Sequence, residues 1–173
     1  MNMFSRRQAK TALYAVVAQV AQAAANPHRL ELLDLLVQAP RSVEQLAEAS
    51  SMSVANASQH LQRLKRAGLV RSERHGTMMR YRTADPTIAR LWVELRTVAE
   101  KQLAEMDRAI DAYRPRRRDV MRLSPAELRH QLDWDAVLLL DARPRLEYDA
   151  GHLPAAVSIP IDELPDRLDE LPA

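Results

Sequence analysis

The chain has 173 residues, which is enough for one large domain or two small ones. It contains no cysteine, which excludes disulfides, thiolate metal sites and cysteine nucleophiles, and no apolar run is long enough to cross a bilayer. Glycine and aromatic residues are scarce, which predicts a mainly helical protein. The formal charge of +2 conceals an asymmetry, because arginines concentrate at 63–82 and 114–118 and carboxylates concentrate from position 133 onward. This separation predicts one half that faces nucleic acid and one half that stays off it.

Two helices are predicted before position 40. Apolar residues recur at spacings of three and four from about 5 to 25, which predicts a long first helix with one continuous apolar stripe. Its basic start and small-residue end also fit a signal peptide, but Gln19 and Gln22 interrupt the apolar stretch. Asn26 and Pro27 predict the N-cap and the first residue of a second helix, which Pro40 ends.

The stretch 42–68 predicts a helix-turn-helix. Ser42 and Gln45 have the spacing of a capping box at the start of a short helix. Ser53 is a favourable N-cap for a second helix that extends to about position 67, and Gly68 can supply the left-handed residue that ends it. Two short helices joined by a turn of a few residues are typical of this motif.

The second helix of this motif has an apolar side and a polar side. At about 100° per residue, Val54, Ala57, Leu61 and Leu64 share one side, which we expect to face the core. Amide and guanidinium groups on the opposite side can bond base edges, while groups at the flanks are better placed for phosphates. We expect base contacts from Asn56, Gln59 and Arg63, and further DNA contacts from Ser53, Ser58, His60 and Arg66.

A basic hairpin is predicted directly after this helix. Gly76 and Thr77 are a turn signal between two extended segments, 69–75 and 78–83. Such a hairpin is a wing, which can lie along the phosphate backbone or in the adjacent minor groove. We expect phosphate contacts from Arg71, Arg74 and Arg80. The alternative is a small helical domain whose polar face is merely solvated.

The strings ANPHRLELLDLL and ASQHLQRLKRAGLV, followed by the basic hairpin, resemble the ArsR-type winged helix-turn-helix repressors. The resemblance covers roughly positions 21–113, a typical single-domain span. It implies a dimeric repressor that binds double-stranded DNA. Many members of that family are released from DNA by metal, bound through cysteine in the helix before the turn or through Asp, His and Glu on the last helix. Positions 42–49 contain no cysteine and positions 86–113 contain no histidine, so we expect no metal and no other cofactor.

A long last helix is predicted from Pro86 to Tyr113, with Asp85 as its cap. Its apolar stripe would extend about 42 Å, which is too long for one small domain to cover. We therefore expect a homodimer in which the N-terminal helix and the helix 86–113 pack against their copies. The alternative is an intramolecular hairpin of these two helices.

The composition changes after position 113. The basic run 114–118, which contains Pro115, predicts a linker at 114–123 that acts as a solvated hinge, with added phosphate contacts as the alternative. The apolar run 137–140 predicts a buried parallel strand.

The string DARPRLEYDAGHLPAA at 141–156 resembles the N-terminal part of a rhodanese domain, over roughly 124–173. The resemblance implies a second strand near 157–159. Rhodanese domains carry sulfur on a cysteine persulfide, so the resemblance implies no sulfurtransferase activity for a chain without cysteine. Asp141 and Arg143 are then expected to be structural, and Ala155 stands where the family usually has glycine. We expect either a fragment of a longer regulator with a rhodanese domain or a degraded remnant docked on the helical domain. In a longer protein with a working rhodanese domain, a persulfide could set DNA affinity.

These observations predict a mainly α protein: a winged helix-turn-helix domain with long dimerisation helices, followed by a partial α/β segment. The expected domains are 1–113 for DNA binding and dimerisation, the linker 114–123, and the partial rhodanese-like segment 124–173. The expected function is that of a cytoplasmic, sequence-specific transcriptional regulator without a membrane partner. The rivals are a sulfurtransferase of a longer parent protein, with this chain inactive, and a protein-interaction module.

Overall fold

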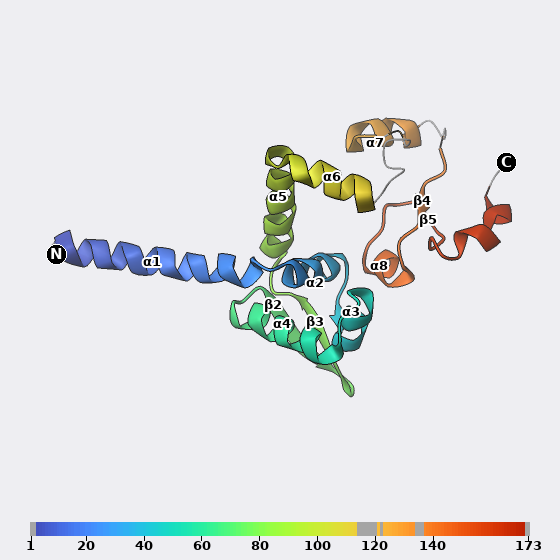
Figure 1. Cartoon of the computed structure of the whole chain (residues 1–173). Coiled ribbons are helices and arrows are strands. Elements are labelled where there is room, and N and C mark those ends of the chain that lie inside the picture. Colours follow the sequence, from blue (N-terminus) through green and yellow to red (C-terminus); the bar gives the residue numbers. More distant parts are fainter. Residues whose placement is uncertain (1–2, 114–120, 122, 134–136, 172–173) are drawn as a thin grey trace. The chain divides into compact units, whose positions relative to one another are not determined.

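The computed structural model describes residues 3–113, 121, 123–133 and 137–171 (Figure 1). Its internal contacts divide the chain into two compact units, Met1–Arg96 and Thr97–Ala173. The predicted linker 114–123 lies mostly outside the described residues, so the predicted domain boundaries stay a prediction. None of the helices in the described ranges combines the length and the apolar character needed to span a bilayer.

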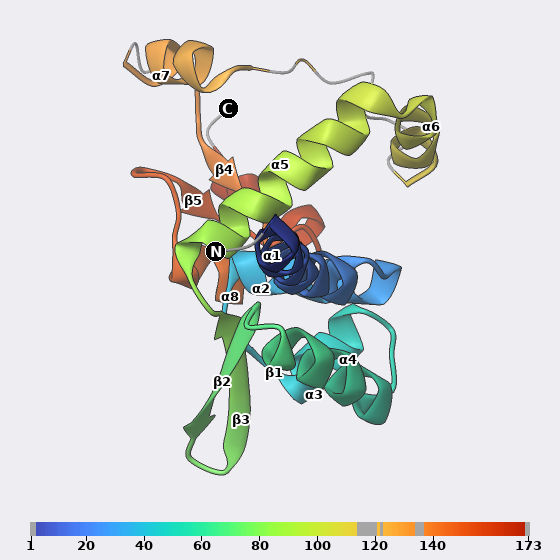
Figure 2. The ribbon, with the colours of Figure 1, turned by 90° about the vertical axis from the view of Figure 1, so that its left-hand side faces the viewer.

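The first unit combines helices with a small antiparallel sheet. Its elements are α1 (Met3–Ala24), α2 (Pro27–Gln38), β1 (Arg41–Ser42), α3 (Val43–Ala49), α4 (Val54–Arg66), β2 (Val70–His75), β3 (Met78–Thr83) and the first part of α5 (Pro86–Gln102). The strand order is β1-β3-β2, and Figure 2 shows β2 and β3 extending downward as a hairpin. The predicted winged helix-turn-helix architecture is therefore confirmed. The short strand β1 was not predicted.

The core of this unit lies where α2, α3, α4 and the base of the sheet meet. It is made almost entirely of leucine, and burying one such side chain contributes about 1.5–3 kcal/mol relative to leaving it exposed. The spacing of these leucines along each helix is what fixes the side that each helix turns inward. The buried cluster consists of Leu32, Leu33, Leu36, Leu46, Leu61, Leu64, Leu69, Val70 and Tyr81.

The predicted helix ends are confirmed by local hydrogen bonds. The Ser42 N–H donates to Gln45 Oε1 at 2.9 Å, and the Gln45 N–H donates to Ser42 Oγ at 3.3 Å, which completes the capping box. Asn26 caps α2 by accepting a backbone N–H, with Pro27 as the first helical residue. Gly68 has φ +73°, the left-handed conformation that ends α4 at low cost.

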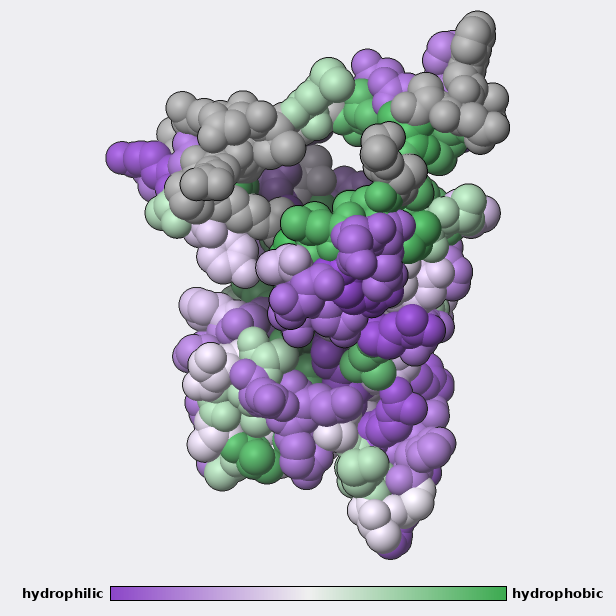
Figure 3. Space-filling view, turned by 90° about the vertical axis from the view of Figure 1, so that its right-hand side faces the viewer, coloured by the Kyte–Doolittle hydropathy of each residue, from purple (hydrophilic) through white to green (hydrophobic). Residues whose placement is uncertain are grey.

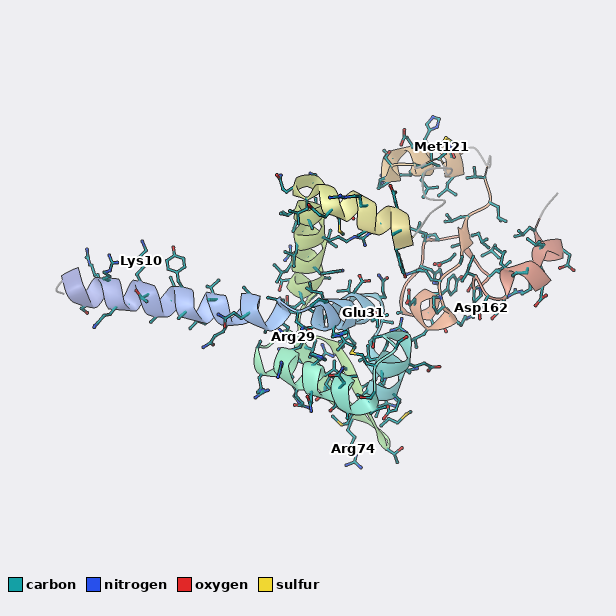
Figure 4. The ribbon with its side chains drawn as sticks, viewed as in Figure 1. Lys10, Arg29, Glu31, Arg74, Met121 and Asp162 are labelled. Atoms are coloured by element: carbon teal, nitrogen blue, oxygen red, sulfur yellow. The ribbon has the colours of Figure 1, made fainter. Side chains whose placement is uncertain are left out.

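A buried arginine holds the end of α1. Arg29 of α2 donates from Nε to the carbonyl of Ala23 and from Nη2 to the carbonyl of Gln22 at 3.1 Å. These carbonyls belong to the last turn of α1, where no further helical N–H is available to them. Figure 4 shows Arg29 where α1 meets α2. The rest of α1 keeps an open apolar side, with Leu13, Tyr14, Val16 and Val17 exposed.

The prediction of one continuous helix over 86–113 is wrong. The helix α5 ends at Gln102, Leu103 lies outside any helix, and α6 (Ala104–Tyr113) follows. The 17 residues of α5 correspond to about 26 Å rather than the predicted length. Sharp helix breaks usually occur at proline, glycine or an inserted side chain, and neither proline nor glycine is present here, so the pattern contained no signal.

The start of α5 is fastened to α2. Trp92 donates from Nε1 to Asp34 Oδ1 at 2.7 Å, and Ile88 packs against the core. Other apolar side chains of α5 stay exposed, namely Leu91, Val93, Leu95 and Val98.

The second unit contains a two-stranded parallel sheet. Its further elements are α7 (Pro125–Asp133), β4 (Leu140–Asp141), α8 (Arg145–Ala150), β5 (Val157–Ser158) and two short 3₁₀ helices, η2 (Leu164–Asp166) and η3 (Leu168–Glu170). The parallel pairing of β4 with β5 confirms the predicted strand pair. The predicted burial of the whole run 137–140 is wrong, since Val137 and Leu138 are exposed. In the described part of the chain β4 has a single sheet neighbour, and one neighbour leaves most of the run uncovered.

Candidate nucleic-acid interface

The helix α4 is positioned by its N-cap and by its buried side. The Asn56 N–H donates to Ser53 Oγ at 3.2 Å, which fixes the first turn. Ala57, Leu61 and Leu64 are completely buried against α2, α3 and the sheet. The helix therefore turns a defined side outward.

The outward side of α4 carries most of the predicted DNA-binding side chains. Gln59 and Arg63 are exposed and Asn56 is half-buried, so the three predicted base-contact residues lie on one accessible side. Arg66 is exposed and donates from Nε to the carbonyl of Gln62 at 3.3 Å. Ser53 is exposed and Ser58 is half-buried. This side offers amide and guanidinium donors in the combination that can read base edges in a major groove.

Two residues of α4 depart from the predicted helical arrangement. Val54 was expected in the core, but it is 47% exposed because it is the first helical residue and lies beyond the covered part of the helix. His60 was expected on the surface, but only 9% of it is exposed. Its position three residues after Ala57 and four before Leu64 places it on the buried side. His60 therefore leaves the set of candidate phosphate contacts.

The titratable groups that act on His60 among the described residues are all basic. Its Nδ1 is buried and has no hydrogen-bond partner there, and its ring centroid lies 5.5 Å from that of His28 on α2. Burial is the main cause that lowers the pKa of His60, and the nearby Arg29, His28 and Arg63 lower it further. Burial and these neighbouring positive charges together favour the neutral form of the imidazole.

We expect the first unit to lose stability in mild acid because of His60. The unfolded chain takes up the proton as the pH falls through about 6.5, whereas the folded chain resists it, so the free energy of unfolding decreases below that pH. Denaturant unfolding between pH 8 and pH 5 measures this dependence. The variant His60→Phe should flatten the curve. Equal slopes for wild type and His60→Phe would contradict the assignment.

The hairpin β2–β3 supplies the predicted basic groups. Arg71 and Arg74 are exposed, and Figure 4 places Arg74 at the free end of the hairpin. Arg74 donates from Nε to the carbonyl of Gly76 at 3.1 Å, so it is folded over its own turn. Arg80 is half-buried and donates from Nη2 to the carbonyl of Pro40 at 3.0 Å, so it is already engaged within the protein. Of the three predicted phosphate contacts, Arg71 and Arg74 are the more accessible.

Two side-chain bonds that the sequence did not indicate join α4 to the hairpin. Gln62 donates from Nε2 to the hydroxyl of Tyr81 at 3.2 Å, and Lys65 donates from Nζ to Ser72 Oγ at 2.6 Å. Tyr81 is buried in the core, which anchors the first of these bonds. The helix and the wing are thus held in one fixed relation, which is a requirement for touching one duplex at two places.

The rhodanese-like segment contains an ordered turn around Asp141. Arg143 binds both carboxylate oxygens of Asp141, with the shortest distance 2.6 Å, and also donates to the carbonyl of Gly151 at 2.9 Å. The hydrogen bond from Arg143 holds the pKa of Asp141 below its usual value. Ala155 has φ +65°, which explains why a glycine is favourable at this position. The bonds of Asp141 and Arg143 within this turn agree with the structural role predicted for them.

An open groove of about 700 Å³ lies beside this turn. Its lining includes Asp141, Arg143, His152 and several leucines. The His152 ring stacks on Tyr148 with ring centroids 3.8 Å apart. Among the described residues, no three His, Asp or Glu side chains come close enough together to hold a metal ion.

Two protein families match different parts of the chain. Residues 24–73 match the helix-turn-helix domain, and residues 124–173 match the rhodanese-like domain. The first match covers α2 to most of β2, and the second covers α7 and everything after it. The fold of the first unit and the outward side of α4 define a winged helix-turn-helix protein.

Individual relatives agree with this classification. The HTH-type transcriptional regulator Rv0324 of Mycobacterium tuberculosis is 43% identical over 169 residues, which cover 98% of this chain and 74% of that protein. The probable mercury resistance operon repressor of Streptomyces lividans is 32% identical over 90 residues, covering 52% of this chain and 72% of that protein. A solved structure from Mycobacterium bovis is the homodimeric winged helix-turn-helix DNA-binding domain of a possible ArsR-family regulator. It is 45% identical with a TM-score of 0.53, and the match covers 56% of this chain and 89% of that chain. The chain belongs to the ArsR-type family of HTH transcriptional regulators.

Proposed function

We propose that the chain acts as a homodimeric repressor that binds operator DNA in the bacterial cytoplasm. The observation that carries the proposal is the accessible amide-and-arginine side of α4, held by side-chain bonds beside a basic hairpin. A merely solvated helix would not need that fixed relation to a second basic element. The repressor role is supported by the related operon repressor of Streptomyces lividans.

The homodimer is supported by apolar surface that a single chain leaves open. Exposed side chains gather on α1 and on α5, the two helices that we expect to meet their copies. The related domain from Mycobacterium bovis is a homodimer. In such a dimer two copies of α4 can read half-sites about one helical turn apart. The domain limits 1–113, 114–123 and 124–173 belong to this proposal.

The proposal assigns two different tasks to the candidate DNA-binding residues. Asn56, Gln59 and Arg63 contact base edges, because amide and guanidinium groups can bond them in pairs. The remaining candidates hold phosphates, which positions the protein without reading sequence. These are Ser53, Ser58, Arg66, Arg71 and Arg74, whereas Arg80 is already held by the carbonyl of Pro40.

We expect Gln59→Ala and Arg74→Ala to weaken DNA binding in different ways. Gln59→Ala should cost about 1–3 kcal/mol on the operator and change which bases are preferred, because one base edge is left without its hydrogen-bonding partner. Arg74→Ala should weaken binding to every duplex. It should also make the slope of log K against log salt concentration shallower by about 0.9 for each phosphate that is no longer neutralised. Titrations of operator and scrambled duplexes at several salt concentrations separate the two results.

The exposed Arg90 of α5 provides the matched control for this experiment. Arg90→Ala removes the same charge at a position that is assigned no DNA contact, and it should leave the binding of both duplexes nearly unaffected. The assignment of tasks is wrong if Gln59→Ala and Arg74→Ala change every duplex equally. A wild-type protein that retards no duplex at low salt would instead favour a protein-interaction module.

We propose that the rhodanese-like segment of this chain does not transfer sulfur. Sulfane-sulfur transfer by a rhodanese requires a cysteine persulfide, and this chain contains no cysteine. A thiosulfate-to-cyanide transfer assay on the purified chain should therefore give only the background rate. Turnover above that rate would revive the sulfurtransferase alternative. A longer protein with a working rhodanese domain can be tested for sulfur control by measuring operator binding with and without a persulfide donor.

A further inference from the structure

One face of the hairpin carries a charged cluster that the proposed DNA contacts do not explain. Residues opposite each other in an antiparallel pair share a face, and Arg71 lies opposite Arg82 while Glu73 lies opposite Arg80. Successive residues on one strand alternate between faces, so all four side chains belong to the same face. Glu73 is the single acidic residue of the stretch 70–83. Figure 3 shows the protruding hairpin, at lower right, as largely hydrophilic.

The carboxylate of Glu73 forms an ion pair with Arg82 in this cluster. Glu73 Oε1 accepts from Arg82 Nε at 2.8 Å and from Arg82 Nη2 at 2.6 Å. Arg82 also donates from Nη1 to the carbonyl of Thr83 at 3.4 Å, so each of its three nitrogens has a partner inside the hairpin. The side chains of Arg82 and Glu73 are 40% and 61% exposed. Exposed ion pairs contribute little to folding stability, so stability alone does not account for an acidic residue on a basic wing.

We propose that Glu73 determines specificity by holding Arg82 away from DNA phosphates and so limiting binding to non-operator duplexes. This inference rests on the proposed function and concerns the same wing. Non-specific binding grows with the number of phosphates that a protein neutralises, whatever the sequence. A regulator finds its operator only if that general attraction stays small relative to the base contacts, and a built-in repulsive charge is a common means to that end.

The variant Glu73→Gln tests the proposal because it keeps the shape of the side chain and removes its charge. Arg82 is then free to reach a phosphate. The slope of log K against log salt concentration should therefore steepen by about 0.9 for each such contact. In 0.1 M salt the same slope corresponds to roughly ten-fold tighter binding per contact on a scrambled duplex. Operator binding should rise by less than this factor, because the base contacts fix the position of the wing on the operator, so the ratio of operator to scrambled affinity should fall. An unchanged ratio would contradict a role of Glu73 in specificity.

Two further variants make the result specific to Arg82. Glu31→Gln adds the same unit of charge on α2, away from the hairpin in Figure 4, and should leave the salt slope unchanged. In an Arg82→Ala background, Glu73→Gln should lose most of its effect, since the captured cation is gone. Circular dichroism of each variant establishes that the hairpin and core remain folded.

The opposite sign would overturn the proposal. If Glu73 instead orients Arg82 toward a phosphate, Glu73→Gln should weaken binding to both duplexes. An unchanged salt slope on the scrambled duplex would also contradict the capture of Arg82. The variants are compared with a wild-type protein that has first been shown to bind its operator. A wild-type protein that binds neither duplex would overturn the proposed function and this inference with it.

Discussion

We expect Leu61→Ala to destabilise the first unit by about 2–5 kcal/mol, which is a large part of the total stability of a small domain. Leu61 is completely buried in the leucine core, where α4 meets α2 and α3. Its truncation removes apolar contacts and leaves a cavity that the surrounding helices fill only in part. DNA binding should fall together with stability, because the same residue holds the outward side of α4 in place. Denaturant unfolding followed by circular dichroism measures the change.

The same helix supplies a control for this experiment. Val54→Ala also shortens an apolar side chain of α4, but Val54 is 47% exposed and its truncation creates no internal cavity. We expect a change within about 1 kcal/mol for this variant. Leu61→Ala and Val54→Ala with equal effects would mean that the described packing of α4 is wrong.

We expect Arg29→Ala to release the end of α1 and to weaken self-association. Arg29 is buried and donates to the carbonyls of Ala23 and Gln22, and a hydrogen bond from a charged donor contributes about 1.5–3 kcal/mol. Without these bonds the last turn of α1 loses the partners that orient the helix on α2. The apolar side of α1 is part of the proposed dimer interface, so its orientation decides whether two copies fit. Thermal unfolding and sedimentation equilibrium together measure both consequences.

Arg6→Ala is the matched control on α1 itself. It removes the same charge from an exposed position, and both the unfolding temperature and the dimer affinity should stay close to wild type. A dimer of Arg29→Ala as tight as the wild-type dimer would show that α1 needs no anchor on α2. That outcome would leave the stabilising role of Arg29 intact while removing its role in assembly.

Local hydrogen bonding made several elements predictable from the sequence alone. The caps at Asn26, Ser42 and Ser53 and the left-handed Gly68 each depend on residues within a few positions of one another. Their geometry is set by backbone groups that must find a partner at a helix end, whatever the rest of the chain does. The periodicity of leucine likewise predicted the inward side of most helices. The parallel strand pair was predicted on other grounds, from the apolar run 137–140 and the rhodanese-like string.

Other features depend on which distant segment lies opposite, and these were decided by tertiary structure. The spacing of His60 from Ala57 and Leu64 puts it on the buried side of α4, and the packing of α2 against that side places its ring beside His28. Glu73 and Arg82 are nine positions apart, and only the hairpin register brings them together.

The amino-acid order by itself determined where the helices α2, α3 and α4 begin, which side of α4 is apolar, and that a basic hairpin follows it. Tertiary structure decided which of the basic groups remain available to a duplex. Arg80 and Arg82 look equivalent to Arg71 in the sequence, yet one is engaged by the carbonyl of Pro40 and the other by Glu73. The physical reason is that helix and turn signals act over a few residues, whereas the pairing of a side chain depends on partners that chain folding brings from elsewhere.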